Sequence, residues 1–188
     1  MSPAELPEGF RSVKEIDLEK DKKAFWTVNI LSLVLLVALG VIGLFVLPKT
    51  VIPRKTVIIQ IVVFILSTVL YYVFHELCHG VLMRAVGGHR PFYAMKSTAF
   101  CAGSRALFRR GAYRVIALAP AVFFSVVFTV GLLLVPAGWK WVFYWLETLN
   151  LSASAGDFYI FACSFGWPRE VLVRDSGISM ELFASEEF

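Results

Sequence analysis

Residues 56–83 read TVIIQIVVFILSTVLYYVFHELCHGVLM, a long apolar stretch whose last third contains His75, Glu76 and His79. An α-helix rises about 1.5 Å per residue, so a helix of this length exceeds the roughly 30 Å hydrocarbon core of a membrane. Ionisable side chains are costly to place in such a helix and therefore tend to have a functional partner. The stretch predicts a transmembrane helix that carries a chemically active polar cluster near one end.

Three further apolar stretches are long enough to span a membrane, and they cover residues 25–47, 113–135 and 140–165. The chain of 188 residues is 58% hydrophobic and 17% charged, with a mean hydropathy of +0.72. A soluble domain carries about a quarter charged residues, so this composition excludes an ordinary soluble domain. We therefore expect an all-α integral membrane protein with about four transmembrane helices.

The segments outside these stretches divide the chain into three parts. Residues 1–24 are expected to form a cytoplasmic or interfacial segment with a short amphipathic helix, residues 25–165 a four-span membrane domain, and residues 166–188 a cytoplasmic tail. The basic loop 84–112 contains the alternating run Pro91-Phe92-Tyr93-Ala94-Met95-Lys96, which favours a short β-hairpin. Lys and Arg are concentrated on alternate segments, which predicts that both termini and this loop lie in the cytoplasm.

The sequence His75-Glu76-Leu77-Cys78-His79 matches the helical zinc motif His-Glu-x-x-His. Two histidines four residues apart lie one turn apart on the same helix face, so both rings can reach one zinc ion. Glu76 lies beside the position that they leave open, where it can act as general base and take a proton from water. The alternative is a polar patch whose neutral histidines hydrogen bond to another helix.

A catalytic zinc ion needs a third protein ligand, and the acidic residues of the remaining spans are Glu147 and Asp157. Counted from the basic residue that precedes each span, His75 lies about 30 Å and Asp157 about 26 Å along its helix, whereas Glu147 lies only about 10 Å in. Asp157 is therefore expected to meet the histidines at a similar depth. Glu147 as the ligand, or Asp157 without any metal role, are the alternatives.

On these residues the chain resembles the site-2 protease group of membrane-embedded zinc metalloproteases. It resembles more closely a bacterial family of small four-span membrane proteins described as zincin peptidases. The resemblance covers about residues 57–165 and rests on the histidine motif, the basic loop, Ala119-Pro120 in the following span, and Asn150 ahead of Gly156-Asp157. The chain lacks the proline of Asn-x-x-Pro and the sequence Leu-Asp-Gly, both typical of site-2 proteases.

The resemblance implies an assignment of roles to individual residues. His75, His79 and Asp157 would be the zinc ligands, Glu76 the general base, and Asn150 a residue near the substrate or the transition state. It also implies a location in the cell membrane, the cytoplasmic membrane of a bacterium.

We therefore expect a membrane-embedded zinc metalloprotease that uses Zn²⁺ to hydrolyse peptide bonds of membrane-anchored or membrane-adjacent substrates near the cytoplasmic face. Its partners would be such a protein or peptide and the lipid bilayer. Nucleic acid is not expected, because the basic residues of a membrane protein first fix its topology. One alternative is a non-catalytic assembly factor with a structural metal site. The other, a metal or proton transporter, would need ionisable residues at several depths.

Overall fold

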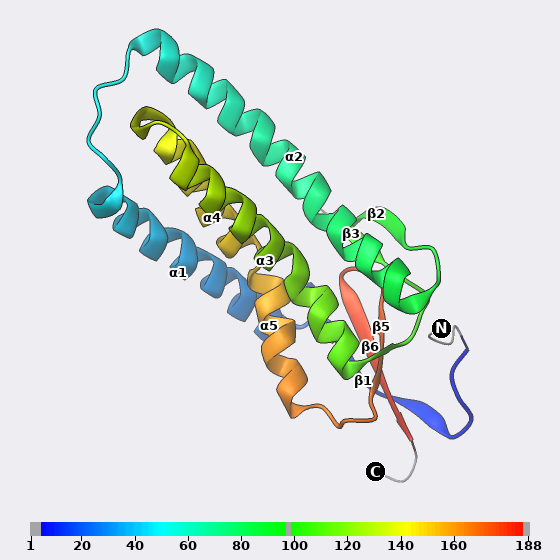
Figure 1. Ribbon diagram of the computed structural model, residues 1–188. Helices are drawn as coiled ribbons and strands as arrows, with labels where there is room; N and C mark the ends of the chain where they lie inside the picture. Colours follow the sequence, from blue (N-terminus) through cyan, green and yellow to red (C-terminus); the bar gives the residue numbers. More distant parts are fainter. Residues whose placement is uncertain (1–4, 97–98, 186–188) are drawn as a thin grey trace.

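The computed structural model describes residues 5–96 and 99–185, and it consists of five α-helices and two small sheets in that part of the chain (Figure 1). The outermost residues of the predicted terminal segments, 1–4 and 186–188, and residues 97–98 of the predicted hairpin lie outside the described residues. The helices are α1 (Lys22–Val46), α2 (Arg54–Gly87), α3 (Arg110–Leu134), α4 (Lys140–Ala153) and α5 (Ala155–Cys163), with short 3₁₀ turns at Ala137–Trp139 and Ser164–Gly166.

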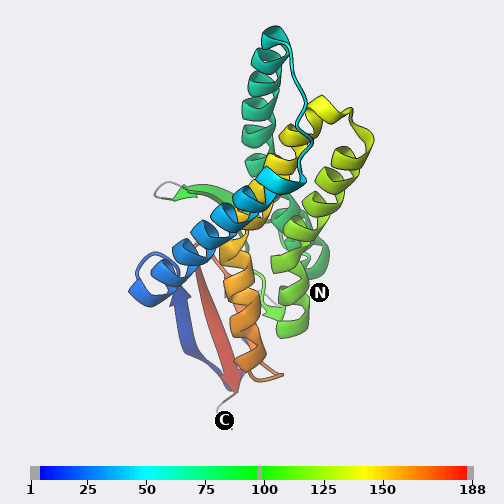
Figure 2. The same cartoon turned by 90° about the vertical axis from the view of Figure 1, so that its left-hand side faces the viewer.

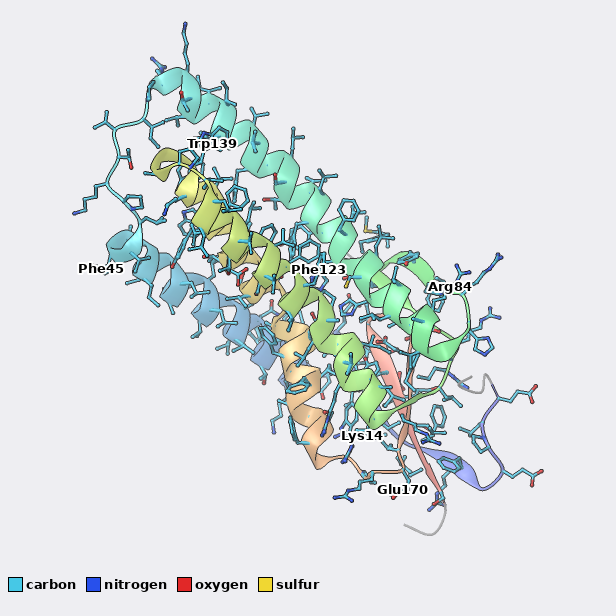
Figure 3. The ribbon with its side chains drawn as sticks, in the orientation of Figure 1. Lys14, Phe45, Arg84, Phe123, Trp139 and Glu170 are labelled. Atoms are coloured by element: carbon cyan, nitrogen blue, oxygen red, sulfur yellow. The ribbon has the colours of Figure 1, made fainter. Side chains whose placement is uncertain are left out.

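Three of these helices, α1, α2 and α3, are long and apolar enough to cross a membrane. Their outer surfaces are apolar: Phe45 and Phe123, labelled in Figure 3, are 83% and 56% exposed. The fourth predicted span is divided at Ser154 into α4 and α5, of 14 and 9 residues. Each of these two helices is shorter than the roughly 20 residues that a single crossing needs.

Helix α4 packs against α1, α2 and α3 and so holds the long helices together (Figures 1 and 2). Gly40 and Gly43 of α1 leave room for aromatic rings of α4. A Cβ added at Gly43 would lie 2.6 Å from the ring of Tyr144. The Tyr144 hydroxyl donates to the Leu39 carbonyl oxygen over 2.6 Å. The two glycines therefore serve packing inside the chain.

The predicted hairpin in the basic loop is confirmed. Strands β2 (Phe92–Lys96) and β3 (Ala99–Gly103) pair antiparallel, with Tyr93 opposite Ala102. The hairpin packs on the last third of α2, where a Cβ added at Gly80 would clash with the Tyr93 hydroxyl oxygen. The glycine that follows the histidine motif thus allows the hairpin to approach the helix.

The two terminal segments form one sheet, which corrects the all-α prediction. Strand β1 (Phe10–Asp17) replaces the amphipathic helix expected in residues 1–24, and it pairs antiparallel with β6 (Ser179–Ser185) (Figure 2). The sheet continues through β5 (Leu172–Asp175) to the two-residue β4 (Phe108–Arg109), in the order β1-β6-β5-β4. The β1–β6 pairing joins residues far apart in sequence, so no local sequence pattern indicates it.

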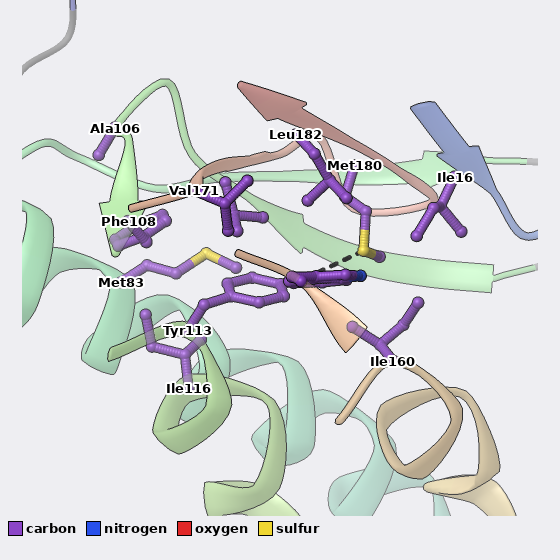
Figure 4. Close-up of a cluster of buried hydrophobic side chains, with 12 residues drawn as sticks. Ile16, Met83, Ala106, Phe108, Tyr113, Ile116, Ile160, Val171, Met180 and Leu182 are labelled. Carbon is purple, nitrogen blue, oxygen red and sulfur yellow. Dashed lines mark hydrogen bonds between the residues drawn. The ribbon is translucent and has the colours of Figure 1, made fainter. Parts of the chain in front are cut away.

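A hydrophobic core joins this sheet to the helices (Figure 4). Met83 of α2 and Tyr113 of α3 meet buried residues of all four strands, among them Ile16, Phe108, Val173 and Leu182. Removing apolar surface from water stabilises a fold by about 25 cal/mol per Å². Burial of these core side chains therefore holds the sheet against the helix ends. The sheet is therefore part of the fold that surrounds the histidine motif.

Candidate metal site

Helix α2 positions the first three residues of the candidate metal site. His75 and His79 are four residues apart, so they lie one turn apart on the inner face of the helix. They are 6% and 9% exposed, and their ring centroids are 5.0 Å apart. Apolar side chains such as Phe74 and Val81, 52% and 64% exposed, cover the opposite face. The helix therefore turns its ionisable groups inward.

Asp157 reaches the two histidines from the first turn of α5. Its Oδ2 lies 3.2 Å from Nε2 of His75, and its Oδ1 lies 3.4 Å from Nε2 of His79. One ligand atom from each of the three residues lies within 4.8 Å of the others, a group that could hold a metal ion. The structure thus brings together the three predicted ligands. Glu147 is not in this group, and its Oε1 instead accepts a hydrogen bond from Ser125 over 2.7 Å.

The hydrogen bond of His79 is compatible with a zinc ion at the site. Nδ1 of His79 lies 3.0 Å from the Ile116 carbonyl oxygen, which can only accept, so Nδ1 carries the proton. In the neutral ring the Nε2 lone pair then faces a carboxylate oxygen of Asp157. Two acceptors at this distance need a cation or a second proton between them. Histidine ligands of zinc commonly donate their other N–H to a carbonyl in this way.

His75 is oriented by a hydroxyl group. Its Nδ1 lies 3.1 Å from the hydroxyl oxygen of Tyr71, one turn earlier on α2. The same hydroxyl lies 3.2 Å from Oδ1 of Asn150. Asn150 is fully buried between α3 and α4, and its side-chain nitrogen donates to the Ala121 carbonyl oxygen over 3.0 Å. The structure therefore places Asn150 behind His75.

Glu76 is held by the hairpin. Its Oε2 accepts a hydrogen bond of 2.8 Å from the backbone N–H of Ala102 in β3. The side chain is half-buried and lines the same cavity as the three candidate ligands. The carboxylate thus lies beside the metal site with a fixed orientation, as a general base would require.

Two cavities meet at the site. The first has a volume of about 290 Å³ and is lined by the candidate ligands and Glu76 on one side, and by terminal-sheet residues on the other, namely Asp175, Gly177, Ile178 and Met180. The second, of about 500 Å³, is lined by Tyr71, Tyr72, His75, Glu76, Met95, Phe100 and Ala153. Asn150 is absent from the described residues that line either cavity.

Asp175 is a further buried carboxyl group in the wall of the first cavity. Tyr113 donates to its Oδ2 over 2.6 Å, and the backbone N–H of Gly177 donates to its Oδ1 over 2.7 Å. Burial raises the pKa of Asp175, and these two hydrogen bonds oppose that shift because they favour the ionised form.

Three contributors to the site were not predicted from the sequence: the Tyr71 hydroxyl, the Ala102 backbone N–H and Asp175. Tyr71 could have been found, because it lies one turn before His75 on the same face of an apolar helix. A backbone donor such as Ala102 leaves no signal in residue type. Asp175 reaches the cavity only through the pairing of the terminal strands.

One comparison with known proteins identifies a family for this chain. Residues 68–172 match a protein family described as "Putative zincin peptidase", and this range contains the histidine motif, the hairpin and Asp157. No curated protein and no solved structure matches the chain. Because the match spans more than half of the 188 residues, the chain belongs to this zincin peptidase family.

Proposed function

We propose that the protein is a membrane-embedded zinc metalloprotease that hydrolyses peptide bonds of membrane-anchored or membrane-adjacent substrates near the cytoplasmic face. One observation carries the proposal: Nε2 of His75 and Nε2 of His79 face the two oxygens of the Asp157 carboxylate. Three ligands leave a coordination position open, which a catalytic zinc site requires and a closed structural site lacks.

In this proposal each residue of the site has a defined role. His75, His79 and Asp157 hold the zinc ion, which when bound polarises the scissile carbonyl group and makes water a better nucleophile. Glu76 removes a proton from the attacking water and returns it to the leaving amine. The Ala102 N–H keeps the Glu76 carboxylate turned toward the cavity during this exchange.

The outer edge of β3 is a candidate binding edge for an extended substrate. The Ala102 N–H donates to Glu76, so it points away from β2 and toward the site. Alternation along an antiparallel strand turns the backbone of Phe100 to the same side, and the Phe100 side chain lines both cavities. A substrate that pairs here would expose a peptide bond that a helix hides.

The terminal sheet supports four crossings of the membrane. Because β1 precedes α1 and β6 follows α5, their pairing requires β1 and β6 to lie on one side of any membrane that the helices cross. The number of crossings between them is then even. Helices α1, α2 and α3 supply three, so α4 and α5 together would supply the fourth. The excess of Lys and Arg in the 84–112 loop supports a cytoplasmic side for this sheet.

Replacing Glu76 by glutamine tests the hydrolytic role. In a strain without the gene, we expect substrates to accumulate uncleaved in the membrane proteome. Wild-type protein should restore cleavage and Glu76→Gln should reduce it by about 10²- to 10⁴-fold, the usual contribution of a general base. Glu15→Gln, the same chemical change at an exposed position of β1, is the matched control and should cleave normally.

Metal analysis of the same purified proteins completes the test. Both variants should contain zinc, because Glu76 is not a ligand. Cleavage by Glu76→Gln at the wild-type rate would overturn the hydrolytic assignment and favour a structural metal site.

A further inference from the structure

We propose that Tyr71 and Asn150 are positioning residues for His75, and that they tie the strength of zinc binding to the packing of α3 and α4. The inference rests on the proposed zinc site and adds to it a hydrogen-bonded chain that is buried at His75, Tyr71 and Asn150. This chain runs from His75 through Tyr71 and Asn150 to Ser125 and Glu147, and it crosses three helices.

The first link is the Tyr71 hydroxyl. If Nε2 of His75 is to bind a metal ion, its Nδ1 carries the proton and donates to Tyr71 over 3.1 Å. The Tyr71 hydroxyl hydrogen is then free to donate to Asn150, whose Oδ1 lies at 3.2 Å and whose backbone oxygen lies farther away, at 3.4 Å. Tyr71 is 2% exposed, and the rings of Phe124 and Phe128 lie 5.1 and 5.9 Å from its own, so the hydroxyl has little freedom to move.

The second link is the Asn150 side chain, whose orientation is set by its neighbours. Its nitrogen lies 3.0 Å from the Ala121 carbonyl oxygen, 3.0 Å from Oγ of Ser125 and 3.4 Å from Oε2 of Glu147. All three can accept a hydrogen bond, so the nitrogen faces them and the side-chain oxygen faces Tyr71. Reversal of the amide would place a donor against Tyr71 and an acceptor against the other groups.

The two histidines are therefore held in different ways. His79 donates to a backbone carbonyl of α3, a partner that does not depend on side-chain identity. His75 depends on two side chains, one of them from α4. Partners of this kind fix the ring and the tautomer of a ligand, and their loss typically weakens metal binding by about 10- to 100-fold.

This role differs from contact with the substrate. The Asn150 amide is fully buried, and both its nitrogen and its oxygen have partners between the helices. Its effect on the reaction would pass through His75. A change at Asn150 should therefore alter zinc affinity, which a residue that contacts only the substrate would leave unchanged.

Zinc affinity of the purified full-length protein, measured by competition with a chromophoric chelator, tests the inference. Tyr71→Phe keeps the packed ring and removes only the hydroxyl, and we expect it to weaken zinc binding by about tenfold or more. Asn150→Ala should do the same, and the double variant should be little weaker than either single one, because the two act in one chain. Tyr144→Phe, the same change at the α1–α4 contact, is the matched control and should bind zinc as the wild type does.

The absorption spectrum of the cobalt-loaded protein gives a second readout. A rotated His75 ring should change the visible bands in Tyr71→Phe and leave them unchanged in Tyr144→Phe. Thermal unfolding in a chelator identifies any variant that fails to fold, and Tyr71→Phe carries the test by itself if Asn150→Ala is such a variant.

Wild-type zinc affinity in both Tyr71→Phe and Asn150→Ala, with loss of zinc in His75→Ala, would overturn the inference and leave the proposed function intact. Failure of the wild-type protein to bind zinc would overturn both.

Discussion

The two walls of the first cavity differ in origin. One wall comes from α2 and α5 and carries His75, Glu76, His79 and Asp157. The other comes from the terminal sheet, from β5, β6 and the turn between them, and includes Asp175, Gly177 and Met180. The family match reaches residue 172, so it includes the first wall and ends where the sheet wall begins. All residues of the proposed reaction thus lie in the helical wall.

The largest expected effect separates the two walls by metal binding. Asp157→Ala should weaken zinc binding by more than about 100-fold, because it removes a ligand and so exceeds the usual effect of a supporting residue. Asp175→Ala, the same change in the opposite wall, should alter zinc affinity by less than about tenfold. Isothermal titration of both variants with zinc measures the difference. Equal losses would mean that the sheet wall takes part in metal binding.

The second effect concerns the stability of the sheet wall. Gly177 has a φ of +97°, and a Cβ added there would lie 2.7 Å from Sγ of Cys101. Gly177→Val should therefore lower the free energy of unfolding by about 1–3 kcal/mol, from backbone strain and the clash. Zinc affinity of the folded fraction should stay close to that of the wild type. Gly111→Val is a contrasting control, because a Cβ at Gly111 meets no atom within 4 Å.

The helical wall was largely predictable from the sequence, and the sheet wall was not. His75, Glu76 and His79 lie within five residues on one helix, and counting helical rise placed Asp157 near their depth. These are local regularities. The sheet wall depends on β1 pairing with β6 across most of the chain, and in β1 only Ile16 is buried. The residues of β1 barely alternate between buried and exposed, so its sequence gives little indication of the strand with which it pairs.

The break at Ser154 was not predicted either. The residues from Lys140 to Phe165 are mostly apolar and include no proline, so a single continuous helix was the simplest interpretation. The structure ends α4 at Ala153 and begins α5 at Ala155, which places Asp157 in the first turn of a new helix.

A third effect follows from the buried carboxyl of the sheet wall. Burial raises the pKa of Asp175, so the folded protein binds this proton more tightly than the unfolded chain does. The stability that this proton contributes is fully present below the pKa of the carboxyl group in the unfolded chain. It is lost as pH rises through the pKa of the carboxyl group in the folded protein. In the presence of a chelator, the melting temperature of the wild type should therefore fall relative to that of Asp175→Asn as pH rises from about 4 to 7. A difference in melting temperature that stays constant over this pH range would contradict a raised pKa at Asp175.

The smallest effect is expected where the sheet faces away from the cavity. Arg174 and Glu181 form an ion pair of 3.8 Å, and their side chains are 33% and 42% exposed. Such pairs contribute about 0–1 kcal/mol. Glu181→Gln should change the free energy of unfolding by less than about 1 kcal/mol and leave zinc affinity and cleavage unchanged, as urea titration and the chelator assay would show.

The strand order β1-β6-β5-β4 has a consequence for the biosynthesis of the protein. Among the described elements β1 is made first, yet its neighbour in the sheet is β6, the last of them. During translation β1 therefore cannot pair with β6 until all five helices have been made. The histidine motif is synthesised long before the wall that closes its cavity. An unfinished chain would thus lack part of one wall of this cavity, which is complete only after residues 179–185 have been made.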